Sequence, residues 1–140
     1  MERNEFLKLL GTASMAVCAG CALESCSSSS DPSVPAAPTN IDFTLDLTAM
    51  ANAALGIDGG SIYKSGIVIV RLSATNYVAL SQSCTHQGTT INFVPLAGNF
   101  LCPNHGSRFS TTGSVINGPA ISSLKKYNTT LTGTDLRVSS

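Results

Sequence analysis

The metal-ligating side chains beyond the first 26 residues are confined to two short clusters. Cys84 and His86 form a C-x-H pair, and Cys102 and His105 form a C-x-x-H pair after fifteen intervening residues. These four are the only Cys and His residues in that part of the sequence. Because thiolates and imidazoles are metal ligands, we expect the two clusters to meet around one metal centre. A disulfide between the two cysteines is the alternative in an exported protein, but it leaves both histidines unexplained.

The sequence around the clusters is typical of short strands. Residues 41–48 alternate apolar and polar side chains, which predicts a half-buried strand. The apolar run at 67–72 predicts a strand buried on both faces, with 77–82 as its hairpin partner. Residues 49–60 show no clear pattern, and a short helix followed by a Gly turn is one interpretation of them. Further short strands are expected at 90–94, 99–101, 108–110, 114–116, 124–130 and 136–139. This pattern predicts an all-β, mainly antiparallel sandwich or barrel.

The two clusters and their surroundings resemble the Rieske iron–sulfur family. The resemblance extends beyond the four ligands to neighbouring residues, namely Gly88, Pro103, Gly106, Ser107 and the run Gly118, Pro119 and Ala120. It implies a Rieske-type antiparallel fold whose tip is formed by the two cluster-binding loops. It also implies one [2Fe–2S] cluster, with Cys84 and Cys102 on the inner iron and His86 and His105 on the outer iron.

This ligand set determines the expected chemistry. Two neutral imidazoles replace two anionic thiolates, so the added electron of the reduced state is less strongly opposed. Rieske centres therefore have reduction potentials of about −150 to +300 mV, against about −400 mV for plant-type ferredoxins. Each imidazole keeps a second ring nitrogen, which can carry a proton or meet a redox partner.

The resemblance also suggests roles for residues that are not ligands. Gly88, Pro103 and Gly106 belong to tight loops that aim backbone N–H groups at the sulfurs. Ser107 matches a position whose hydroxyl donates to a bridging sulfide and raises the potential. Pro119 belongs to a loop that covers the cluster.

Other positions lower the expected potential. Phe109 stands where high-potential members of the family have Tyr, so the hydroxyl that would reach a cluster cysteine is absent. Thr89 and Asn104 occupy the two positions where the quinol-oxidising members carry a disulfide between the loops. We therefore expect an intermediate potential.

The N-terminal 26 residues are typical of an export leader. Arg3 and Lys8 are followed by 15 uncharged residues, fewer than the roughly 20 needed to span a bilayer. The segment resembles twin-arginine and lipoprotein signals, with Asn4 in place of the second arginine. Cys21 and Cys26 are the lipidation candidates, and an uncleaved or ordinarily cleaved leader is the alternative.

Residues 27–40 form a Ser- and Pro-rich linker that could reach about 45 Å when extended, and residues 41–140 form the expected Rieske domain. We expect a protein of the bacterial cell envelope on the periplasmic side, tethered to the membrane by lipid. It would transfer one electron at a time to or from a c-type cytochrome, a quinol-oxidising complex or another oxidoreductase.

Several other functions are weighed against this hypothesis. The chain could be the small electron-transfer subunit of a larger membrane oxidoreductase, or a structural zinc module with a Cys₂His₂ ligand set. A Rieske oxygenase needs a further iron site, and no His is left to form one. A cytoplasmic Rieske ferredoxin is disfavoured by the leader. We expect no catalytic site in the chain itself. The low charged fraction of 11% and the zero net charge argue against nucleic-acid binding.

Overall fold

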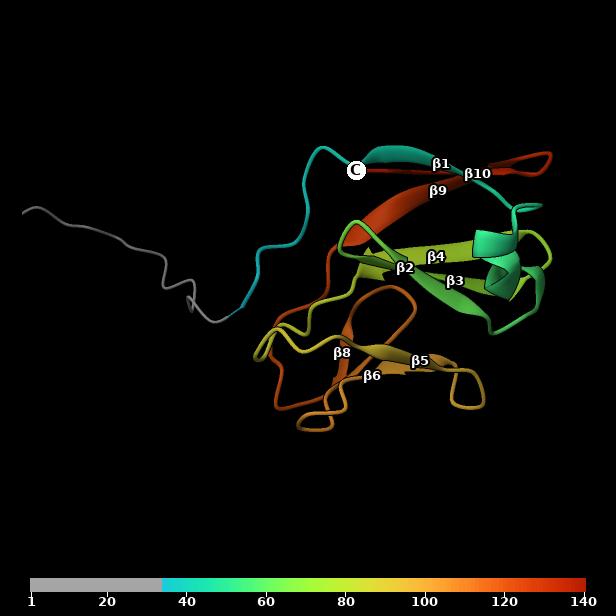
Figure 1. Cartoon of the computed structure of the whole chain (residues 1–140). Coiled ribbons are helices and arrows are strands. Elements are labelled where there is room, and N and C mark those ends of the chain that lie inside the picture. Colours follow the sequence, from blue (N-terminus) through green and yellow to red (C-terminus); the bar gives the residue numbers. More distant parts are fainter. Residues whose placement is uncertain (1–33) are drawn as a thin grey trace, which may run out of the picture.

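The computed structural model describes residues 34–140, which form two antiparallel sheets and a short 3-10 helix (Figure 1). The predicted leader, the lipidation candidates Cys21 and Cys26 and the first half of the predicted linker lie outside the described residues. The elements in chain order are β1 (Asp42–Asp46), η2 (Met50–Gly56), β2 (Ser61–Lys64), β3 (Ile67–Ser73), β4 (Asn76–Ser81), β5 (Asn92–Val94), β6 (Asn99–Leu101), β7 (Arg108–Phe109), β8 (Val115–Asn117), β9 (Lys126–Thr132) and β10 (Asp135–Ser139).

The larger sheet has six strands in the order β1-β10-β9-β4-β3-β2. Its strand β3 is the apolar run predicted to be buried on both faces, and the prediction is confirmed. Ile67 and Ile69 point into one hydrophobic cluster, whereas Val68 and Val70 point into another. Because successive side chains of a strand point to opposite faces, only a strand covered on both sides can bury four in a row.

The smaller sheet has four strands in the order β5-β6-β7-β8 and carries the motif region. It packs against one face of the larger sheet: Phe100 of β6 and Phe109 of β7 share a buried cluster with Val68 and Val70. On the other face of the larger sheet, Leu55 of η2 is buried in a cluster with side chains of the sheet itself, including Leu45 of β1. The fold is therefore all-β and antiparallel, as the sequence predicted.

Some elements differ from the sequence-based expectation. The short helix left open at 49–60 is present as η2, but strand β2 was not anticipated. β2 is a four-residue edge strand with two exposed side chains, so its alternation is too short to detect. Strand β9 begins at Lys126, two residues later than expected.

The chain enters the described region along the outside of the domain, where residues 34–40 precede β1 (Figure 1). Pro38 contacts the domain, because its carbonyl oxygen accepts hydrogen bonds from Tyr127 and Lys125. In the part of the chain that the structure describes, no helix is long and apolar enough to cross a membrane.

Candidate metal centre

The first motif forms a tight loop between β4 and β5. The bridge between Ser83 and Thr90 closes its base. Inside it, the Cys84 N–H donates to the carbonyl of Thr89 at 2.8 Å, and the Gly88 N–H donates to the carbonyl of Cys84 at 2.7 Å. Gly88 has a φ of 77°, in the left-handed region where Gly is favoured.

The second motif, between β6 and β7, repeats this loop. The pairing of Leu101 with Arg108 closes its base. The Cys102 N–H donates to the carbonyl of Ser107 at 2.8 Å, and the Gly106 N–H donates to the carbonyl of Cys102 at 3.0 Å. Gly106 has a φ of 80°. The two loops therefore share one backbone pattern, with the cysteine at the first position and the glycine four residues later.

The two cysteines lie together at the buried side of the loops. Both are free thiols, so the disulfide alternative is wrong for this structure, and they belong to the same hydrophobic cluster. Burial raises the pKa of the Cys84 thiol, the neighbouring Cys102 side chain raises it further, and hydrogen bonds from the backbone N–H groups of His86 and Gln87 act to lower it. These N–H groups are donors of the kind that stabilise a thiolate ligand.

The two histidines lie together at the outer side of the loops. The ring centroids of His86 and His105 are 4.9 Å apart and the rings meet edge to face at 80°. His86 is half-buried and His105 is exposed. Within residues 34–140, no group of three or more His, Cys, Asp or Glu side chains is gathered closely enough to hold a single metal ion. The four predicted ligands are instead arranged as a buried thiol pair and an outer imidazole pair.

A third loop is attached to both motif loops. The buried Ser107 hydroxyl oxygen accepts a hydrogen bond from the Ala120 N–H at 3.0 Å. The Thr85 hydroxyl donates to the carbonyl of Ser122 at 2.6 Å. These bonds hold the segment containing Pro119 against the two loops, where the family resemblance predicted a covering loop.

A side-chain contact also joins the two motif loops. The side-chain amide of Asn104 donates to the side-chain carbonyl of Gln87 at 3.4 Å. When the two loops are aligned on their cysteines, Gln87 in the first loop corresponds to His105 in the second. The tip is therefore formed by one imidazole and one amide from each loop.

The remaining predicted residues differ in their exposure to solvent. Phe109 is fully buried in the hydrophobic cluster that contains both cysteines. Pro103 and Pro119 are exposed. The sequence did not reveal Thr85, Gln87 or Ala120 as contact residues, because their partners are far along the chain and two of the contacts involve backbone groups.

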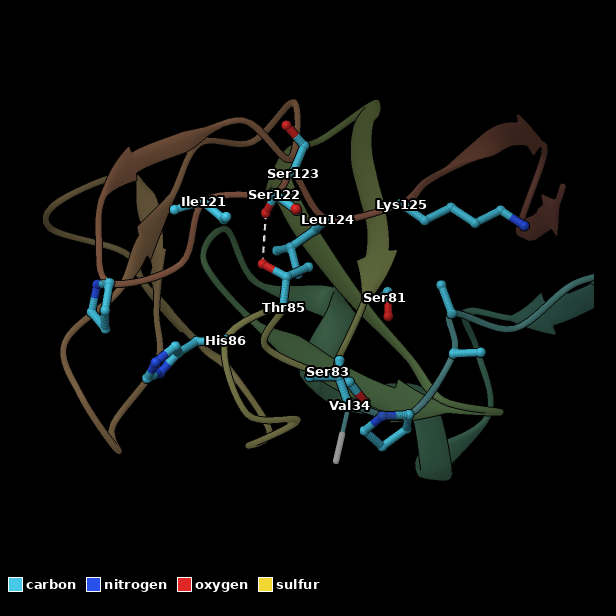
Figure 2. Close-up of a pocket in the computed structure, with 14 residues that line it drawn as sticks. Val34, Ser81, Ser83, Thr85, His86, Ile121, Ser122, Ser123, Leu124 and Lys125 are labelled. Atoms are coloured by element: carbon cyan, nitrogen blue, oxygen red, sulfur yellow. Dashed lines mark hydrogen bonds between the residues drawn. The ribbon is translucent and has the colours of Figure 1, made fainter. Parts of the chain in front are cut away.

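A cavity of about 680 Å³ begins beside the tip (Figure 2). His86 lies toward one end of this cavity and Lys125 toward the other. Val34 lies on one side of the cavity, and Ile121 and Ser122 lie on the opposite side (Figure 2). The described chain therefore starts at a cavity that the first motif loop also borders.

Comparison with known proteins identifies similar sequences. The family model described as the Rieske [2Fe-2S] domain matches residues 48–128. The chain is 35% identical over 72 residues to the cytochrome b6-f complex iron-sulfur subunit of Chlorobaculum thiosulfatiphilum, which covers 51% of this chain and 40% of that protein. It is 38% identical over 82 residues to the corresponding subunit of Synechococcus elongatus, covering 59% and 44%. The chain thus spans less than half the length of these curated relatives.

Two solved structures resemble the fold. The plasma membrane Rieske protein of Synechocystis PCC 6803 has a TM-score of 0.52 and 30% identity, covering 68% of this chain and 92% of that one. The ferredoxin of carbazole 1,9a-dioxygenase from Nocardioides aromaticivorans IC177 has a TM-score of 0.54 at 20% identity, covering 73% and 98%. The second similarity supports the fold alone.

Proposed function

The chain belongs to the Rieske [2Fe–2S] domain family, and we propose that it transfers single electrons in the cell envelope through a cluster held by Cys84, Cys102, His86 and His105. The family implies one Rieske-type [2Fe–2S] cluster. The assignment of the four ligands is our proposal, and it accounts for every Cys and His in residues 27–140.

The observation that carries this proposal is the separation of the four side chains into two pairs. The thiols of Cys84 and Cys102 lie in the hydrophobic cluster, and the rings of His86 and His105 lie 4.9 Å apart at the outside. A binuclear group with two thiolates on one iron and two imidazoles on the other takes its ligands in two such pairs. The pairing supports this group over the single zinc ion considered from the sequence.

When bound, such a cluster accepts and releases one electron at a potential raised by its two neutral ligands. The protein supplies its environment. Burial of both cysteines keeps water away from the sulfurs, and the N–H groups of His86 and Gln87 stabilise the thiolate of Cys84. The exposed ring of His105 offers the short path to a partner, and its second nitrogen can hold or release a proton.

The location and partners form part of the same proposal. We infer that residues 1–26 direct export and that lipidation at Cys21 or Cys26 tethers the domain on the periplasmic side of a membrane. The partner would be a c-type cytochrome, a quinol-oxidising complex or another oxidoreductase. Two observations support this: the relatives are named as subunits of a cytochrome b6-f complex, and a structural neighbour is named a plasma membrane protein.

Metal analysis of the purified full chain tests the function. Wild type is expected to contain iron and acid-labile sulfide in equal amounts and no stoichiometric zinc. His105→Ala and Cys102→Ser are expected to lose the Rieske visible spectrum, whereas Leu96→Ala, at an exposed position outside the two motif loops, is expected to keep it. Zinc without sulfide in the wild-type protein would overturn the proposal.

A second candidate is the electron-transfer subunit of a larger membrane oxidoreductase. The relatives named as complex subunits favour it. Affinity purification from solubilised membranes separates the two functions: a stable complex supports a subunit, and isolation of the chain alone supports a free carrier.

A further inference from the structure

Residues 34–38 are attached to the domain although their Pro- and Ala-rich composition is typical of a linker. The carbonyl oxygen of Pro38 accepts a hydrogen bond from the Tyr127 hydroxyl at 2.7 Å and another from Lys125 Nζ at 2.9 Å. A carbonyl oxygen has two lone pairs, so it can accept both. Tyr127 is only 2% exposed, so loss of this contact would leave a largely buried residue without its hydroxyl partner.

The turn between β2 and β3 is shaped for the same contact. A Cβ added to Gly66 would lie 2.7 Å from Cγ of Pro38, closer than side chains approach one another. Gly66 also has a φ of 79°, which other residues rarely adopt. The ring of Pro38 therefore lies directly against the backbone of this turn, a second contact independent of the hydrogen bonds.

The attached segment reaches the cavity that His86 also lines. Val34 and His86 line the same cavity, whose opposite wall includes Ile121 and Ser122 (Figure 2). Figure 1 shows residues 34–40 running from the side of the motif loops toward β1. The chain therefore leaves the domain beside the first motif loop and not beside the turn between β9 and β10.

We propose that residues 34–38 are a strap docked on Gly66, Lys125 and Tyr127, which places the exit of the N-terminal tether at the cavity that His86 also lines. The His86 and His105 rings, where electrons are exchanged, then face the membrane surface to which the tether is attached. The partner is accordingly a redox protein held at that same membrane surface. This inference rests on the proposed function, because it takes the chain to be tethered.

The length of the tether strengthens this inference. With processing at Cys26, residues 27–33 alone would lie between the lipid and the strap. Seven residues span at most about 25 Å when fully extended, against about 45 Å for the whole of 27–40. Docking therefore shortens the reach of the domain and keeps its tip near the membrane.

Limited proteolysis of the full chain with an unspecific protease tests the docking. In wild type, the protected core identified by mass spectrometry is expected to begin before residue 38. In the double variant Tyr127→Phe with Lys125→Met, residues 34–40 are expected to be cleaved at least about tenfold faster, since two hydrogen bonds are lost. The control pair Tyr63→Phe with Lys126→Met makes equivalent changes away from the strap and is expected to match wild type. A wild-type core that begins after residue 40 would overturn the strap.

Fluorescence quenching on vesicles tests whether the side of the domain that carries the cavity faces the membrane. The full chain is labelled at Ser123→Cys, beside the cavity, or at Thr134→Cys, in the turn between β9 and β10, and bound to vesicles with a quencher on the lipid headgroup. Wild type is expected to show several-fold stronger quenching at position 123, and the double variant is expected to lose this difference. Equal quenching in bound wild type contradicts the inference. Failure to bind vesicles contradicts the tether of the proposed function, while the proteolysis still decides whether the strap is docked.

Discussion

Gly88 and Gly106 hold equivalent positions in two loops of the same backbone pattern. Each donates its N–H to the carbonyl of the cysteine four residues earlier, and their φ values are 77° and 80°. The loops differ in the histidine position, which is the third residue in the first loop and the fourth in the second. The rings of His86 and His105 lie 4.9 Å apart, although the two loops join different pairs of strands.

The first prediction concerns the backbone of the second loop. Gly106→Ala is expected to destabilise the domain by about 1–2 kcal/mol, because a side chain is disfavoured at this φ. An added Cβ would meet no atom within 4 Å, so the effect is conformational and not steric. Urea unfolding followed by circular dichroism measures it.

Two other glycines provide controls for this substitution. Gly98→Ala, at a φ of 61° in the turn between β5 and β6, is expected to lose similar stability, because its backbone conformation is of the same kind. Gly56→Ala, which has open space and no positive φ, is expected to be neutral or slightly stabilising. Equal stability of Gly106→Ala and wild type would show that the loop tolerates a side chain there.

The second prediction concerns Ser107. Its oxygen accepts the Ala120 N–H, so its own hydrogen is left to donate to a group between the loops. Ser107→Ala is expected to cost about 1–3 kcal/mol, because a buried N–H loses its acceptor. It is also expected to lower the midpoint potential, measured by redox titration. Ser123→Ala, an exposed serine, should change neither quantity; an unchanged potential in Ser107→Ala would argue against the role of the hydroxyl.

The third prediction concerns the potential itself. The midpoint is expected in the interior of the range of about −150 to +300 mV, because Ser107 is present but Phe109 carries no hydroxyl. Phe109→Tyr is expected to raise the midpoint. Phe100→Tyr, on the adjacent strand of the same buried cluster, is the control and should leave it unchanged. A wild-type midpoint at either end of the range would refute the expectation.

The sequence predicted the parts of the fold whose side chains alternate or are uniformly apolar. The alternating segment at 41–48 contains β1 (Asp42–Asp46), in which Leu45 is buried. The apolar run at 67–72 lies within β3 (Ile67–Ser73), between two hydrophobic clusters. These assignments succeed because burial of apolar side chains determines both the pattern and the structure. Strand β2 was missed because an edge strand of four residues buries too few side chains to produce a detectable apolar pattern.

Contacts to backbone groups were the larger part of what the sequence did not predict about the site. The carbonyl of Ser122 accepts from Thr85 across 37 residues, and the carbonyl of Pro38 accepts from Tyr127 across 89 residues. Every residue has a carbonyl, so no residue type marks these acceptors. The four proposed ligands, in contrast, were evident because Cys and His are few and closely spaced.

The central claim is that two imidazole nitrogens bind the cluster, and pulsed electron paramagnetic resonance of the reduced protein tests it most directly. With ¹⁵N-labelled histidine, we expect hyperfine couplings from two directly bound nitrogens, and their loss in His105→Ala. A reduced signal without any histidine coupling in wild type would contradict the account.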